Sequence, residues 1–86
     1  MKNHACTVCG WPKLAEPPRS ASGGGSFEIC PCCGFQFGVS DDDEGHTDAA
    51  WRARWIRDGM EWSSASRPAP ARWSARRQLT RAGLNP

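Results

Sequence analysis

Residues 27–35, Phe-Glu-Ile-Cys-Pro-Cys-Cys-Gly-Phe, share a pattern with residues 6–11, Cys-Thr-Val-Cys-Gly-Trp. Each stretch holds a Cys-x-x-Cys pair followed by glycine and an aromatic residue. Two cysteines at this spacing can direct both thiolates at one metal ion, and the glycine lets the backbone turn so that amide N–H groups point at the sulfurs. One such pair is a weak signal, but two match the template of a four-cysteine zinc site. The predicted zinc ligands are Cys6, Cys9, Cys30 and Cys33.

Two further residues near these pairs could act as ligands. Cys32 would replace Cys33 only if the second pair shrank to Cys-x-Cys, and His4 would be needed only if one cysteine were unused. We expect His4 to be an ordinary exposed histidine and Cys32 to be a thiol beside the metal-bound sulfurs. A redox or catalytic role for Cys32 would need a nearby base, and the sequence identifies none.

The length and composition of the chain indicate one small domain that needs a metal. With 86 residues, of which 38% are hydrophobic, the apolar core must be thin. In small modules zinc contributes about 10–16 kcal/mol of apparent binding energy to folding, and five tryptophans can supply much of the remaining core. No apolar run is long enough for a signal peptide or a membrane span. Paired cysteines without an export signal predict a cytoplasmic location.

The predicted fold class is a small metal-stapled α+β domain. Alternating apolar residues at 26–29 and 35–39 predict short strands around the second cysteine pair. Together the two pairs would form a zinc-ribbon-like pair of knuckles, followed by one or two short helices. The predicted organisation is a zinc-ribbon-like domain with a Trp-rich helix over residues 1–62, a Pro/Ser linker over 63–71, and a short C-terminal helix or tail over 72–86.

The pattern of residues 48–58 predicts the first helix, with Thr47 or Asp48 as its N-cap and Gly59 at its end. Trp51 and Trp55 are four residues apart and share one face, which we expect to press on the zinc corners. The arginines of this helix should point outward.

A second helix is predicted over residues 75–82, with Ser74 as N-cap and Gly83 as stop. Its apolar face, made of Ala75, Leu79 and Ala82, is weak, so this helix is either loosely docked or ordered by a partner.

Charge is divided unevenly between the two halves of the chain. Residues 1–48 carry three basic and seven acidic side chains, and residues 49–86 carry eight arginines against two acidic residues. The acidic residues gather in a turn at 41–44, which we expect to be solvated. The halves could attract each other inside one fold, or the basic half could meet an acidic partner.

The sequence resembles the small bacterial cysteine-rich CPCC proteins over residues 5–62. The first cysteine pair departs from the pattern, because it reads Cys-Thr-Val-Cys and the Cys-Pro-Cys-Cys string lies in the second pair. The resemblance implies a bacterial cytosolic zinc-ribbon-like protein and says little about its task. It is carried by the two cysteine pairs, Glu16-Pro17-Pro18, Phe27 to Gly38, the acidic turn, Trp51-Arg52, Trp55-Ile56, Gly59-Met60 and Trp62.

Three classes of function are open to such a chain. The favoured class is a protein-binding module, which includes inhibitors of the immunity or antitoxin type. The alternative is a nucleic-acid-binding zinc ribbon that uses its Arg-rich helices, although the acidic turn would repel phosphate. An enzyme is disfavoured because four thiolates leave zinc no open position, no nucleophile–base pair is visible and no small-molecule substrate is evident. The candidate partner-binding residues are Trp62, Trp73, Arg76 and Arg77.

Overall fold

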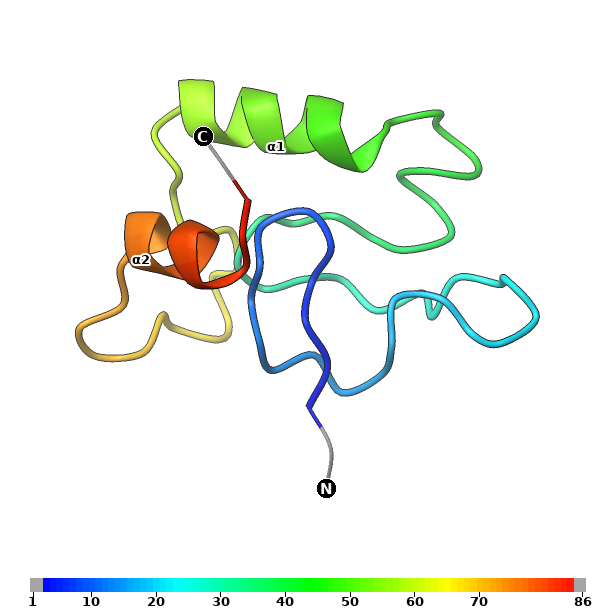
Figure 1. Ribbon diagram of the computed structural model, residues 1–86, viewed down its shortest axis with the longest axis horizontal. Coiled ribbons are helices and arrows are strands. Elements are labelled where there is room, and N and C mark those ends of the chain that lie inside the picture. Colours follow the sequence, from blue (N-terminus) through cyan, green and yellow to red (C-terminus); the bar gives the residue numbers. More distant parts are fainter. Residues whose placement is uncertain (1–2, 85–86) are drawn as a thin grey trace.

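A computed structural model describes residues 3–84 of the chain (Figure 1). This part contains two helices, α1 (Asp48–Arg57) and α2 (Ala75–Arg81), and three isolated antiparallel bridges but no strand. Long irregular segments make up the N-terminal half, α1 runs along one side of the molecule, and α2 lies beside the N-terminal loops, below α1 in this view (Figure 1). Within residues 3–84, neither helix has the length and apolar character needed to cross a membrane.

The two cysteine corners fold alike. We call residues 6–11 the first knuckle and residues 30–35 the second knuckle. In each, the first cysteine donates its backbone N–H to the carbonyl of the aromatic residue after the glycine, at 2.8 Å for Cys6 and 2.9 Å for Cys30. The glycine donates in return to the carbonyl of that cysteine, at 2.9 Å in both knuckles. Both glycines have φ near +80°, at +86° for Gly10 and +80° for Gly34, a conformation that glycine adopts without strain.

The predicted strands around the knuckles are reduced to single bridges. One bridge joins His4 to Leu14 outside the first knuckle, and another joins Ile29 to Gln36 outside the second. Extended backbone cannot continue before Ile29, because Phe27 lies in the left-handed region with φ 63°. The knuckle pair is therefore present without the ribbon of strands that the sequence predicted.

Helix α1 follows the sequence prediction closely. The Thr47 hydroxyl accepts a hydrogen bond from the Ala50 N–H at 3.1 Å, and Gly59 follows the helix with φ +106°. Trp55 is buried and Trp51 is half-buried, and both pack on the hydrophobic core. The prediction that these two tryptophans form the inner face of the helix is confirmed.

Helix α2 is packed onto the body of the protein. Ser74 caps it by accepting a hydrogen bond from the Arg77 N–H at 3.3 Å. Leu79 is fully buried and Gln78 is almost fully buried. The start of the predicted linker also contacts the second knuckle, because the Ser63 N–H donates to the Cys32 carbonyl at 2.9 Å. The helix was expected to be either loosely docked or ordered by a partner, and the structure shows it packed more closely than the first of these, through Leu79 and Gln78.

The core gathers around the knuckles rather than between sheets. Its buried members come from both knuckles, from the residues that flank them and from each helix. All five tryptophans belong to this cluster or pack against it, as their number in so short a chain suggested. The fully buried large side chains are Phe35, Phe37, Leu14, Leu79 and Val8.

Candidate metal centre

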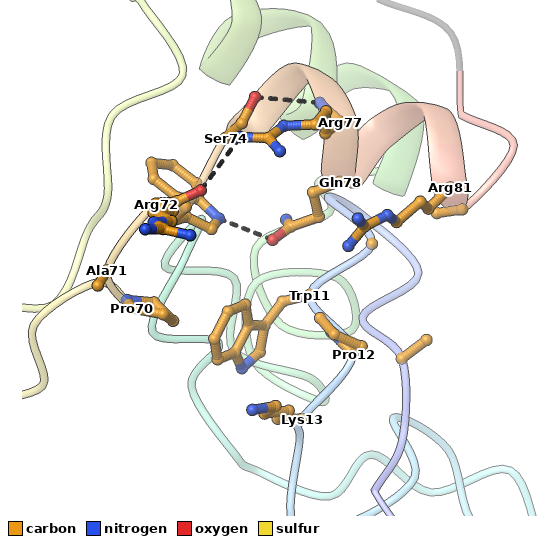
Figure 2. A pocket seen from close by; sticks show the side chains of 14 residues that line it. Trp11, Pro12, Lys13, Pro70, Ala71, Arg72, Ser74, Arg77, Gln78 and Arg81 are labelled. Carbon is orange, nitrogen blue, oxygen red and sulfur yellow. Dashed lines mark hydrogen bonds between the residues drawn. The ribbon is translucent and has the colours of Figure 1, made fainter.

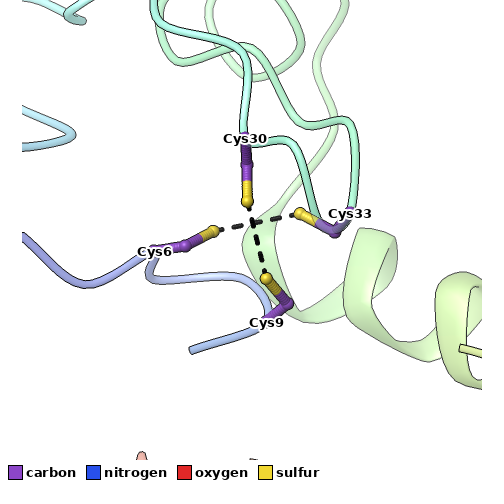
Figure 3. A group of neighbouring side chains, drawn as sticks. All are labelled: Cys6, Cys9, Cys30 and Cys33. Atoms are coloured by element: carbon purple, nitrogen blue, oxygen red, sulfur yellow. Dashed lines mark hydrogen bonds between the residues drawn. The ribbon is translucent and has the colours of Figure 1, made fainter. Parts of the chain in front are cut away.

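The two knuckles bring four cysteine sulfurs together at the middle of the core. All four thiols are buried, and their sulfur atoms lie within 4.8 Å of one another. The Sγ atoms of Cys6 and Cys33 are 3.9 Å apart, and those of Cys9 and Cys30 are 3.6 Å apart (Figure 3). A tetrahedron with metal–sulfur bonds of about 2.3 Å has edges of about 3.8 Å. The four cysteines are thus positioned to bind a single metal ion.

Neither alternative ligand belongs to this cluster. Cys32 is buried beside it, but its sulfur accepts a hydrogen bond from the Gln78 amide at 3.3 Å and lies outside the group of four. His4 pairs through its backbone with Leu14, and its side chain does not join the cluster. The ligand set chosen from the spacing is the one that the fold assembles.

The crowding of the four sulfurs perturbs their acidity. Hydrogen bonding to Cys30, then to Cys6 and Cys9, raises the pKa of Cys33, and burial adds to the effect. Hydrogen bonding from Cys30 and then Cys33 lowers the pKa of Cys6. A bound metal ion would supply the positive charge that allows all four thiols to ionise.

Helix α1 holds both knuckles through side chains on its inner face. The Trp51 Nε1–H donates to the carbonyl of Cys33 at 2.9 Å. The Arg52 guanidinium donates to the carbonyl of Val8 at 3.1 Å and to that of Thr7 at 3.3 Å. This helix therefore holds the backbone of the first knuckle through Arg52 and the backbone of the second knuckle through Trp51.

Helix α2 makes the corresponding contact from the other end of the chain. The side-chain amide of Gln78 donates to the carbonyl of Cys9 at 2.9 Å and reaches the sulfur of Cys32. The oxygen of the same amide accepts a hydrogen bond from the Trp73 indole at 2.9 Å. One buried side chain thus joins both knuckles to the segment that precedes α2.

Two of these contacts were not predicted from the sequence. Arg52 was expected to point outward, but it is half-buried because its guanidinium reaches back to the first knuckle. Gln78 is not part of the predicted apolar face of α2, which consists of Ala75, Leu79 and Ala82. The position of Gln78 could have indicated its contact, because a residue three after Ala75 lies on the same face of the helix.

The candidate partner-binding residues do not form one exposed group. The rings of Trp62 and Trp73 pack edge to face with centroids 5.3 Å apart, and Trp62 packs in the same way on Trp11 at 4.9 Å. Both are only half-exposed. Arg76 and Arg77 lie at the surface of α2. The tryptophans therefore contribute to the core, whereas the two arginines remain free to meet a partner.

Each ion pair of the described residues joins two residues of the same half of the chain. Arg19 pairs with Asp41 and Asp42 and ties the acidic turn to the preceding loop. Hydrogen bonding from Arg19 lowers the pKa of Asp42, so this carboxylate stays ionised at neutral pH. Among residues 3–84 no ion pair joins the acidic half to the basic half. The arginines of α2 therefore keep their charge available.

Two proteins of Bacillus subtilis (strain 168) are similar to this chain. The uncharacterised protein YozI is 33% identical over 75 residues, which covers 70% of this chain and 62% of YozI. The uncharacterised protein YoaQ is 33% identical over 73 residues, which covers 69% of this chain and 62% of YoaQ. The chain thus spans about three fifths of the length of these relatives. No family model matches the chain, and no solved structure matches it.

Proposed function

We propose that this chain is a non-enzymatic zinc protein whose four-cysteine site is structural and which acts by binding another protein. An inhibitor of the immunity or antitoxin type is one form of such a module. The observation that carries the proposal is the closed set of four buried thiols. An ion with four protein ligands has no open position for water or substrate, so the metal would stabilise the fold rather than perform chemistry.

Zinc is the ion that best suits this donor set. Four thiolates in a tetrahedron are typical of zinc or of iron, and zinc has no geometric preference that such a site would strain. The two sulfur–sulfur distances of 3.6 and 3.9 Å lie on either side of the value for a regular zinc tetrahedron. The resemblance to small CPCC proteins supports the same cofactor and a cytoplasmic location.

The distribution of charge supports a binding role. Arg76 and Arg77 are exposed and take part in no ion pair among residues 3–84. A partner with acidic groups would be drawn to this helix, with charge affecting mainly the rate of association. No small molecule or membrane needs to be invoked for such a role.

The test is capture of a partner from a lysate of the source organism, identified by mass spectrometry for both protein and nucleic acid. The metal-loaded chain is compared with an Arg76→Ala/Arg77→Ala variant and with an Asp42→Ala/Asp43→Ala variant. We expect the wild type to capture one defined protein, the aspartate variant to capture the same protein, and the arginine variant to fail to capture it. Absence of any stoichiometric protein would contradict the proposal.

Nucleic-acid binding is the second candidate, and the eight arginines of residues 49–86 favour it. Such binding would fall steeply with salt, because counterion release dominates the affinity. A gel shift with DNA and RNA at physiological salt separates the two candidates. Micromolar binding that is abolished by the arginine variant and unaffected by the aspartate variant would replace the protein partner with a nucleic acid.

A further inference from the structure

A groove of about 400 Å³ lies between the first knuckle and α2 (Figure 2). Its walls are apolar, with Trp11 and Pro12 on one side and Pro70 and Trp73 on the other. Hollows of this volume are common binding sites in proteins. No acidic residue lines the groove, and its basic lining residues are Lys13, Arg72, Arg77 and Arg81.

These basic side chains are not neutralised by the protein itself. All four are exposed, and none takes part in an ion pair among residues 3–84. The Arg77 guanidinium donates only to the backbone carbonyl of Arg72, at 3.3 Å. The groove therefore combines apolar walls with basic side chains that have no acidic partner. Such a lining is complementary to a segment that carries both apolar and acidic side chains.

Trp11 gives an independent indication of a ligand. Its side chain is only 5% exposed, and its indole Nε1 is the single buried side-chain nitrogen or oxygen among the described residues that has no hydrogen-bond partner. A buried donor without an acceptor costs free energy, so such groups are rare. The nitrogen edge of the ring is turned toward Lys13 (Figure 2). Because Lys13 is exposed and flexible, it can move aside to admit an acceptor.

We propose that this groove binds a short acidic segment of another protein. An apolar side chain of the segment packs against Pro12 and Pro70, its carboxylates meet Arg72, Arg77 and Arg81, and a backbone carbonyl accepts the hydrogen bond of Trp11 Nε1. The inference rests on the proposed protein-binding function and adds the chemistry of the partner. A peptide fits better than a nucleic acid, because Trp11 is buried and Trp73 packs on Trp62, which leaves little ring face for stacking bases.

The experiment selects random eight-residue peptides by phage display on the metal-loaded full chain. The strongest peptide is then synthesised, and its affinity is measured by fluorescence anisotropy. We expect the selected peptides to be enriched in Asp and Glu over the input library. Arg77→Gln should weaken binding at least about fivefold, whereas Arg67→Gln should change it less than about twofold. Arg67 is the matched control because it is an exposed arginine that does not line the groove.

Two further variants separate lost binding from lost folding. Arg72 has φ 66°, a conformation that glycine adopts more readily, so Arg72→Gly should weaken the peptide without harming the fold. Trp11→Phe keeps an aromatic ring of smaller size and removes the N–H. The smaller ring costs some packing, so the metal-loaded variant should lose some stability but remain folded by near-ultraviolet circular dichroism, while peptide affinity falls at least about threefold.

Each failure has its own meaning. Peptides without acidic enrichment, or equal affinity for the wild type and the groove variants, would overturn the assignment of the groove. Binding that is lost in Arg67→Gln and kept in Arg77→Gln would leave a protein-binding role intact but move it off the groove. Failure to select any peptide, together with tight binding of an oligonucleotide, would overturn both proposals.

Discussion

Cys32 lies next to a predicted metal ligand in the sequence but is not itself part of the four-cysteine cluster. It is fully buried, yet its sulfur is held by the Gln78 amide at 3.3 Å rather than by the four-cysteine cluster. Cys33, the next residue, points into the cluster with its sulfur 3.9 Å from that of Cys6. The spacing of the knuckle, and not burial, therefore separates the two thiols.

Serine substitutions at these adjacent positions test the ligand set. Cys33→Ser should lower the metal content well below one ion per chain, because serine is a poor ligand for a soft site. Cys32→Ser should keep the metal, since the hydroxyl can still accept from Gln78. Elemental analysis of both purified variants checks this, and the reverse result would exchange the two residues in the ligand set.

Gly10 carries a second constraint at the residue scale. It has φ +86°, and a Cβ atom there would lie 2.7 Å from the Cβ atom of Ala82 in the segment after α2. Gly83 has a similar φ of +73° but open space around it. An L-residue at either position would therefore adopt the same strained backbone conformation, but only the one at position 10 would also be crowded by a neighbouring atom.

This pair allows strain and crowding to be measured apart. Gly83→Ala should cost about 1–2 kcal/mol of unfolding free energy, the usual strain of a left-handed L-residue. Gly10→Ala should cost roughly 1–3 kcal/mol more, because α2 must also shift away from the first knuckle. Chemical denaturation of the metal-loaded variants gives both values, and equal costs would show that α2 does not press on Gly10.

At the scale of elements, α2 depends on one buried polar side chain. Gln78 donates to the carbonyl of Cys9 and to the sulfur of Cys32, so it ties the helix to both knuckles. Gln78→Ala should destabilise the protein by about 1–3 kcal/mol, because the Cys9 carbonyl is left buried without a donor. Arg76→Ala, an exposed change on the same helix, should cost less than about 0.5 kcal/mol. Urea denaturation measures both, and equal effects would contradict the docking role of Gln78.

The loop before the second knuckle depends on the acidic turn. Arg19 donates to the carbonyl of Gly23 at 2.8 Å and pairs with Asp41 and Asp42, so one side chain joins the loop to the turn. Arg19→Ala should free the loop around residues 20–26 and raise its rate of cleavage by a non-specific protease at pH 7. Arg67→Ala removes another exposed arginine, outside this loop, and should leave that rate unchanged. Unaltered cleavage in Arg19→Ala would mean that the ion pairs do not order the loop.

The elements differ in how far their sequences predict them. Capping residues and a tryptophan stripe are local signals, and both predicted helices form within about one residue of their expected ends. The strands were wrongly expected, because alternation at residues 26–29 does not reveal that Phe27 adopts φ 63°. Arg52 and Gln78 were missed because their partners are 44 and 69 residues away along the chain, at Val8 and Cys9. Such contacts depend on the tertiary fold, so the spacing of nearby residues in the sequence predicts them only weakly.

At the scale of the whole molecule, the two knuckles and both helices converge on the four cysteines. The first knuckle supplies two thiols, the second supplies two, and α1 and α2 bond to the carbonyls of the knuckles. In place of a sheet, three isolated bridges connect the irregular segments of residues 3–84. A domain with so thin a framework should fold only when the two knuckles are held together.

The most direct test of this account is a chelator titration in which bound metal and near-ultraviolet circular dichroism are followed together. The tryptophans packed around the knuckles report tertiary structure, so their signal should vanish in step with the metal. We expect one zinc ion per chain at the start, a single cooperative loss of metal and signal, and recovery of both when zinc is returned. A chain that keeps its tryptophan signal after all metal has been removed would contradict the claim that the metal centre holds the fold.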